Sequence, residues 1–77
     1  MMFKALDTVV LERDLPTLGL RKGDLGAVVQ IYLPDSVDVE FVTAAGKTEA
    51  LTTLNVRDVR PVAADDLVSV RRYSRTG

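Results

Sequence analysis

The chain has 77 residues, of which 47% are hydrophobic, and its formal net charge is −1. It contains no cysteine and no histidine, which excludes disulfide cross-links, thiolate metal sites and imidazole chemistry. A chain of this length forms one small domain that buries only about 60% of its unfolded surface, so we expect an oligomer or a partner to add to its stability.

The N-terminal segment and the apolar runs predict a soluble, cytoplasmic protein. Residues 1–4 are not followed by an apolar segment of the roughly 7–15 residues that a signal peptide requires. Charged residues such as Asp7, Glu12 and Asp24 interrupt every apolar run before it reaches the roughly 18 residues of a membrane span.

Two strands and a long loop are predicted in the first part of the chain. Residues 6–12 are rich in β-branched side chains, which favours a strand. Residues 13–23 mix charges with a proline and two glycines, so they predict a long loop that is anchored on the barrel by Leu15 and Leu20.

Two glycines introduce the second strand, which we expect over residues 27–33. We expect Gly23 to supply a positive φ at the turn. Gly26 marks either a bend or the close approach of another backbone, which are the usual reasons for a glycine at the start of a strand.

A hairpin is predicted in the middle of the chain. Residues 37–42 alternate, which places Val37, Val39 and Phe41 inward and Asp38 and Glu40 outward. Gly46 is expected at the positive-φ position of the turn, before a return strand over residues 47–53. The inward residue of that strand is either Ala50 or Leu51, because a shift of one residue exchanges them.

The last elements complete the expected fold. Residues 54–55 predict a single helical turn, and residues 56–62 predict a short strand with Val59 inward. Five short strands with a long loop after the first predict an all-β, five-stranded SH3-like barrel over residues 1–62. Residues 63–77 form a C-terminal extension that is partly helical or flexible, and its ordered part is either a short helix or an extra strand.

Four strings of the sequence carry a family resemblance: LDTVVL at residues 6–11, DLPTLGLRKGDLGAVV at 14–29, VEFV at 39–42 and VRDVRPV at 56–62. The chain resembles the small bacterial proteins of the domain of unknown function 4926 family. This resemblance implies an SH3-like barrel over nearly all of residues 3–62. It also implies a bacterial protein that is sometimes encoded beside a companion, as immunity and antitoxin proteins are. It implies no catalytic residues, since the family has no established reaction.

The reactive side chains predict a protein that is not an enzyme and has no cofactor, metal or small-molecule substrate. Without histidine and cysteine, an acid, base or nucleophile has to come from a carboxylate, lysine, tyrosine or serine. Asp38 and Glu40 lie about 7 Å apart on one strand face, but we interpret that face as a solvated outer surface. The glycines of residues 19–26 precede a strand and match no phosphate-binding pattern.

Weak nucleic-acid binding is the alternative function. Residues 1–62 hold seven basic and nine acidic side chains, whereas residues 63–77 hold three basic and two acidic side chains. The alternative interface combines basic residues of the long loop and the tail, with Tyr73 as a stacking ring: Arg21, Lys22, Arg71, Arg72 and Arg75. The acidic body and a total of four aromatic residues count against it.

Association with another protein is the function that the sequence favours most. A barrel of this size cannot cover all of its apolar side chains. The residues expected to form an exposed interaction patch are Val10, Val28, Leu67, Val68, Val70 and Tyr73. The partner is either a second copy of the chain or the companion of a two-protein bacterial system. The alternative role of residues 63–77 is to fold over the barrel and close it.

Overall fold

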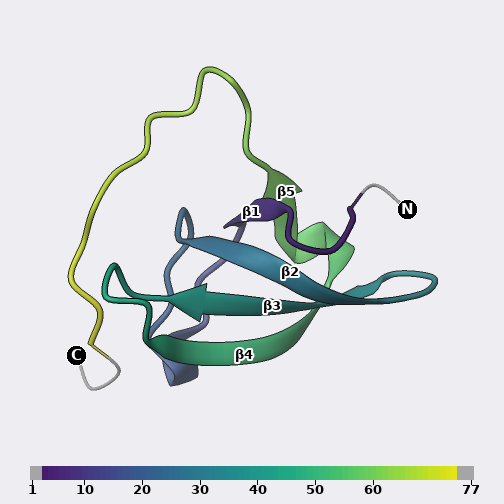
Figure 1. The fold of residues 1–77 in the computed structure, drawn as a ribbon, viewed down its shortest axis with the longest axis horizontal. Helices are drawn as coiled ribbons and strands as arrows, with labels where there is room; N and C mark the ends of the chain where they lie inside the picture. The colour runs from purple at the N-terminus through teal and green to yellow at the C-terminus, as the bar shows by residue number, and fades with distance from the viewer. Residues whose placement is uncertain (1–2, 75–77) are drawn as a thin grey trace.

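The computed structural model describes residues 3–74, and these form five strands and two short 3-10 turns (Figure 1). The strands are β1 (Thr8–Leu11), β2 (Leu25–Tyr32), β3 (Ser36–Val42), β4 (Thr48–Asn55) and β5 (Val59–Pro61). The turns are η1 (Pro16–Leu18), in the long loop, and η2 (Val56–Asp58), directly before β5. All neighbouring strands pair antiparallel in the order β4-β3-β2-β1-β5. This topology confirms the predicted all-β, SH3-like barrel.

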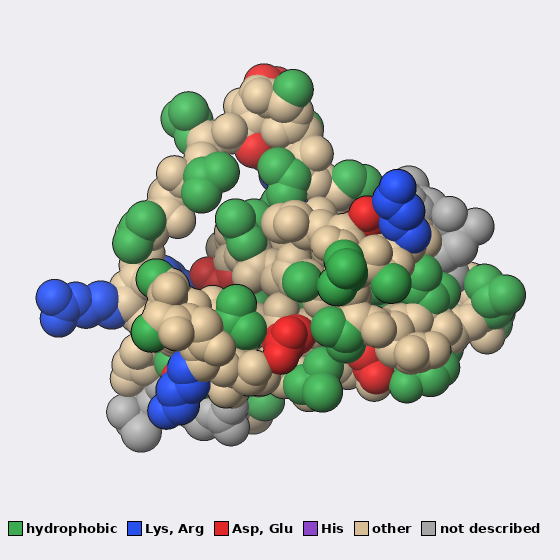
Figure 2. All heavy atoms as spheres, in the orientation of Figure 1, with side chains coloured by type: hydrophobic (Ala, Val, Ile, Leu, Met, Phe, Trp, Pro, Cys, Tyr) green, Lys and Arg blue, Asp and Glu red, His purple; other side chains and the backbone are tan. Residues whose placement is uncertain are grey.

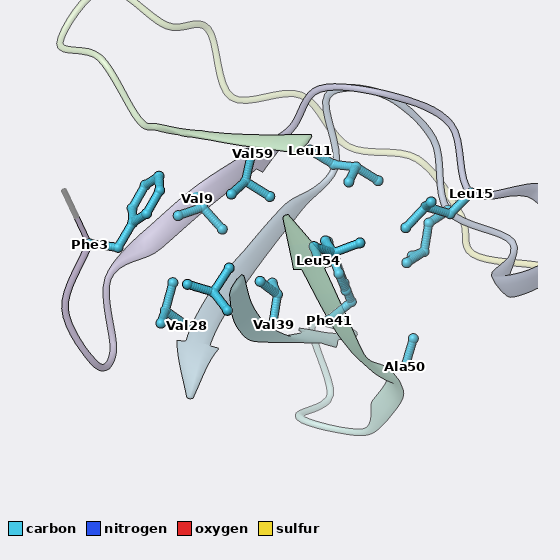
Figure 3. Packing of buried hydrophobic residues seen from close by; sticks show 12 residues of the cluster. Phe3, Val9, Leu11, Leu15, Val28, Val39, Phe41, Ala50, Leu54 and Val59 are labelled. Carbon is cyan, nitrogen blue, oxygen red and sulfur yellow. The ribbon is translucent and has the colours of Figure 1, made fainter. Parts of the chain in front are cut away.

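The core lies inside the curl of the sheet, and Figure 3 shows its side chains converging from all five strands. The buried side chains of the described residues are all hydrophobic. Those with almost no exposed surface are Val9, Leu11, Val28, Val37 and Val39. Phe3 packs at one end of this cluster, beside β1. The apolar positions of the strands thus supply one continuous core, as a small barrel requires.

The hairpin of β3 and β4 agrees closely with its sequence pattern. Val37, Val39 and Phe41 are buried, and Gly46 has a φ of 87° in the turn. Ala50 is buried and Leu51 is 61% exposed, which settles the register that the sequence left open. A regular alternation therefore predicted this element in detail, because one face of the hairpin meets the core and the other meets solvent.

Gly23, which precedes β2, and Gly26, which is the second residue of β2, have different roles. Gly23 has a φ of 97°, which confirms the expected positive φ. A Cβ atom on Gly26 would lie 2.5 Å from Cγ1 of Val39 and 2.9 Å from Cε1 of Phe41. Gly26 is therefore required by the close approach of β3, and the register irregularity of β2 lies further along, between Val28 and Gln30.

The long loop is anchored as predicted, and the segment before β5 is displaced. Leu15 and Leu20 are buried and form an antiparallel bridge with N–O distances of 2.9 and 3.1 Å. Asn55 ends β4, and its side chain accepts a hydrogen bond of 2.9 Å from the backbone of Arg57. This contact starts η2 two residues later than expected and shortens β5 to three residues.

The prediction of a C-terminal helix or extra strand is wrong for the described part of the extension, because residues 62–74 form neither. A side-chain oxygen that caps the start of a helix accepts from a backbone N–H further along the chain, but the carboxylate of Asp66 reaches back and accepts a 2.6 Å bond from the backbone of Ala63. The chain then continues in an extended form, away from the sheet (Figure 1). Within residues 3–74 there is no helix with the length and hydropathy needed to cross a membrane.

Candidate functional site

The extended residues 62–74, which we call the strap, leave β5 and return to the barrel beside η1 (Figure 1). The strap is attached to the barrel near its beginning and near its end. Between these attachments it bows away from the sheet. Its geometry is therefore set by two groups of side chains.

The first attachment is an ion pair between Arg60 and Asp66. The guanidinium donates to both carboxylate oxygens at 2.8 and 2.9 Å, and Glu12 lies 3.4 Å from its Nε. Hydrogen bonds from Arg60 and from the backbone of Ala63 lower the pKa of Asp66 from 3.8 to about 2. Asp66 is therefore held as a carboxylate that fixes the turn at the start of the strap.

The second attachment, which we call the latch, joins the end of the strap to the long loop. Arg71 donates to both carboxylate oxygens of Asp24, with 2.9 Å for the Nε bond, and to the carbonyl of Gly19 at 2.9 Å. The hydroxyl of Tyr73 donates to the carbonyl of Leu18 at 2.7 Å. The latch thus consists of a bidentate ion pair and a tyrosine hydrogen bond. These contacts join residues that are 47 to 55 positions apart in sequence.

Partial burial and nearby positive charges shift the pKa of Asp24 in opposite directions. Burial raises the pKa of this carboxyl, but hydrogen bonds from Arg71 and from the backbone of Arg21, with the charges of both arginines, lower it below its ordinary value overall. The pKa of Arg71 is raised, first by its hydrogen bond to Asp24. The side chains are 18% and 26% exposed, so solvent weakens this ion pair less than it weakens one on the open surface.

A cleft of about 910 Å³ lies between the strap and the barrel, and Figure 2 shows the opening. Its apolar wall on the barrel includes Val10, Leu25 and Val42, of which the last two are 39% and 52% exposed. Residues 67–70 line the opposite side. The cleft therefore offers apolar surface on both sides, with the charged latch at one end.

The apolar residues of the strap itself are almost uncovered. Leu67 and Val70 are each 96% exposed, and Val68 is 71% exposed. Within the described range 3–74, residues 67–70 have no hydrogen bond to the barrel. The middle of the strap is thus a short apolar segment held in the open by attachments on either side.

The predicted interaction patch is correct in part. Leu67, Val68 and Val70 are exposed as expected, but the expectation that Val10 and Val28 are exposed is wrong. Val28 belongs to the core, because β2 points this residue into the curl of the sheet. Val10 is 7% exposed, since β1 lies between β2 and β5 and its outer face forms the wall of the cleft.

Tyr73 packs against the core cluster and donates its hydroxyl to the barrel, so it is part of the latch and not a free ring. Its expected role as an open stacking surface is therefore wrong. The basic residues of the alternative interface do come together, since Arg21, Lys22, Arg71 and Arg72 all line the cleft. Arg71 is engaged by Asp24, and Arg75 lies outside the described residues.

The paired carboxylates of β3 face outward, as predicted, and are occupied by hydroxyl groups. Asp38 accepts from Tyr32 at 2.9 Å and from Thr53, and Glu40 accepts from Thr48 at 2.6 Å. The hydrogen bond to Asp38 raises the pKa of Tyr32. In residues 3–74 no group of three or more acidic side chains could hold a metal ion. These contacts brace the outer face of the sheet.

Sequence reasoning missed the acidic halves of both attachments. Asp24 and Asp66 carry no local signal for their role, since each has the spacing of an ordinary turn residue. Their partners are defined by the path of the strap, and Arg71 is 47 residues away from Asp24. Only the surplus of basic residues in the tail hinted that it could meet an acidic barrel.

Comparison with curated proteins and with solved structures gives no significant match. A family model matches residues 5–61, which span β1 to β5 and include the latch residues Leu18, Gly19 and Asp24. The strap residues Arg71 and Tyr73 lie beyond the matched range. The match covers all five strands, and the chain belongs to the family described as Domain of unknown function (DUF4926).

Proposed function

We propose that this protein is a non-catalytic protein-interaction module that binds its partner through the strap and the cleft beneath it. The observation that supports this proposal is the exposure of Leu67, Val68 and Val70 between two fixed attachments. Exposed apolar side chains are common singly, but three within four residues on a held segment form a surface suited to a partner.

Burial of this small surface by a partner would contribute a substantial free energy of binding. Full burial of an aliphatic side chain of this size contributes about 1.5–3 kcal/mol. Because the attachments already order the strap at both ends, less conformational entropy is lost on binding than for a free tail. A partner that covers these three residues therefore has enough apolar contact for specific association.

The partner in this proposal is a second copy of the chain or the small protein's companion in a two-protein bacterial system. The second possibility rests on the resemblance to family members that are encoded beside a companion. Either partner would use the cleft wall at Leu25 and Val42 as the other half of the binding surface.

The test compares two triple variants. Replacing Leu67, Val68 and Val70 with serine is expected to weaken self-association, or capture of a companion by immobilised protein, by at least about tenfold. The matched control replaces exposed residues outside the strap, Leu6, Leu33 and Leu51, with serine. Sedimentation equilibrium measures self-association, and quantitative pull-down measures capture of the companion.

The control variant is expected to behave like the natural protein in both assays. Equal association by the two variants would refute a binding role for the strap. A natural chain that is monomeric at all concentrations and captures no companion would refute the proposal as a whole.

A second candidate is weak nucleic-acid binding, which is favoured by the gathering of Arg21, Lys22 and Arg72 around the cleft. Fluorescence anisotropy with single-stranded and duplex probes, at two salt concentrations, distinguishes it from protein binding. Salt-sensitive binding that is lost when these three residues become alanine would support this candidate, and the absence of any binding at moderate salt would refute it.

A further inference from the structure

We propose that the partner is a second copy and that two chains exchange their straps, so that Arg71 and Tyr73 of each chain dock on the barrel of the other. This inference rests on the proposed function and assigns its partner. The latch itself supports it: the end of the strap and the surface that receives it belong to the same sequence, so every contact of the latch can form between two copies.

The middle of the strap has the properties of an exchange hinge. Residues 67–70 have no hydrogen bond to their own barrel in the described structure, and their apolar side chains are uncovered. Redirecting this segment to another barrel would therefore break no contact within it. The contacts that hold the strap lie on either side of the hinge, at Asp66 and at Arg71.

The short reach of the hinge determines the arrangement of the two copies. The five steps from Asp66 to Arg71 span at most about 17 Å. The molecule itself is 34 Å in its longest dimension. Two barrels that exchange straps must therefore lie close together, with their hinges crossing near the twofold axis.

When the two hinges cross closely, the exchanged dimer is more stable than a monomer whose latch forms within one chain. In the monomer, Leu67 and Val70 remain almost fully exposed although the latch is complete. In the exchanged dimer the latches are unchanged and the two hinges cover each other, so apolar surface is buried at no loss of existing contacts. Short hinges and identical docking sites are the conditions under which exchange of a terminal segment is favoured.

Charge reversal tests this arrangement directly. Asp24→Arg places two arginines at the latch of one chain, and Arg71→Asp places two aspartates there. Neither variant can form the latch alone, within one chain or between identical chains. In an equimolar mixture, Arg71 of the Asp24→Arg chain can pair with Asp24 of the Arg71→Asp chain. The reverse pairing brings together the two substituted side chains, which are also of opposite charge.

We expect each single variant to dimerise at least about tenfold more weakly than the natural chain, and the mixture to recover heterodimers measured by native mass spectrometry. The double variant D24R/R71D restores the pair within one sequence and should dimerise again. A natural dimer whose affinity is unchanged in either single variant would refute exchange and leave the proposed interaction role intact. A monomeric natural chain would also refute exchange, and the companion pull-down then decides the proposed function.

A second measurement keeps the latch residues natural, in case a charge-reversed chain does not fold. The protein has no cysteine, so Ser69→Cys gives a unique position for a nitroxide label on the exposed strap. The labelled chain is mixed with an unlabelled chain enriched in ¹⁵N. Exchange predicts paramagnetic broadening of the Gly19 and Asp24 amides in the enriched chain. A dimer without this broadening would overturn the proposal.

Discussion

Gly26 illustrates how one residue fixes the packing of two strands. It lies opposite Val9 in the pairing of β1 with β2, and its missing side chain leaves room for Val39 and Phe41 of β3. The constraint is steric, because Gly26 is not among the glycines with a positive φ. Any side chain at this position would displace two buried residues of the core.

Gly26→Val is expected to lower the free energy of unfolding by more than about 1 kcal/mol, because its Cβ would meet Cγ1 of Val39 at 2.5 Å. Urea unfolding of this variant, of Val39→Ala and of the double variant measures the effect. The double variant should lose less stability than the sum of the single variants, since Val39→Ala removes the clashing atom. Additive losses would show that the contact with Val39 is not the cause.

The strap shows how an element without regular structure is ordered by side chains. Its backbone forms no ladder, and Arg60, Asp66, Arg71 and Tyr73 supply the contacts that hold it. Both acidic partners have lowered pKa values, so both attachments depend on the carboxylates being charged. Strap docking is therefore sensitive to acid in a way that the apolar core is not.

Acidification is expected to release the strap before the barrel unfolds. The folded pKa values of Asp24 and Asp66 lie below 3.8, that of Asp66 at about 2, so the stabilising effect of each carboxylate is present above pH 3.8 and is lost as the pH falls through its folded pKa. Arg71 and Arg60, which face these carboxylates, have raised pKa values and stay charged throughout. The chain has two tyrosines and no tryptophan, so in a Tyr32→Phe background fluorescence reports on Tyr73 alone.

We expect the Tyr73 signal to change as the pH falls below 3.8, through the lowered pKa of Asp24, while the far-ultraviolet circular dichroism of the barrel persists. The control is Arg71→Gln in the same background, whose latch is already open and should give no transition. A constant Tyr73 signal across this range in the parent chain would contradict an electrostatic latch.

The elements that could be predicted from sequence are those whose contacts follow a local period. β3 alternates between core and solvent, so its inward residues and its turn at Gly46 were identified correctly. The strap could not be predicted in this way, because Leu67, Val68 and Val70 suit a helix, a strand or an interface equally. Val10 was misplaced for a related reason: β1 is flanked by β2 and β5, and β5 is distant from it in sequence.

At the scale of the whole molecule, a self-contained barrel carries an appended segment. The core cluster draws on β1 to β5, and from the strap only Tyr73 packs against it in the described structure. The match to the family model ends at residue 61, before the strap begins. The barrel supplies stability and a docking surface, and in our account the strap supplies the means of association.

The most direct test of this account is sedimentation equilibrium of a chain that ends at Val62, compared with the full chain. The shortened chain is expected to keep its cooperative unfolding, because all five strands and nearly all of the core remain. Alone, it should sediment as a monomer at concentrations where the full chain associates with itself. Mixed with the companion, it should remain unbound at concentrations where the full chain forms a complex. A shortened chain that associates as tightly as the full chain would contradict the assignment of binding to the strap.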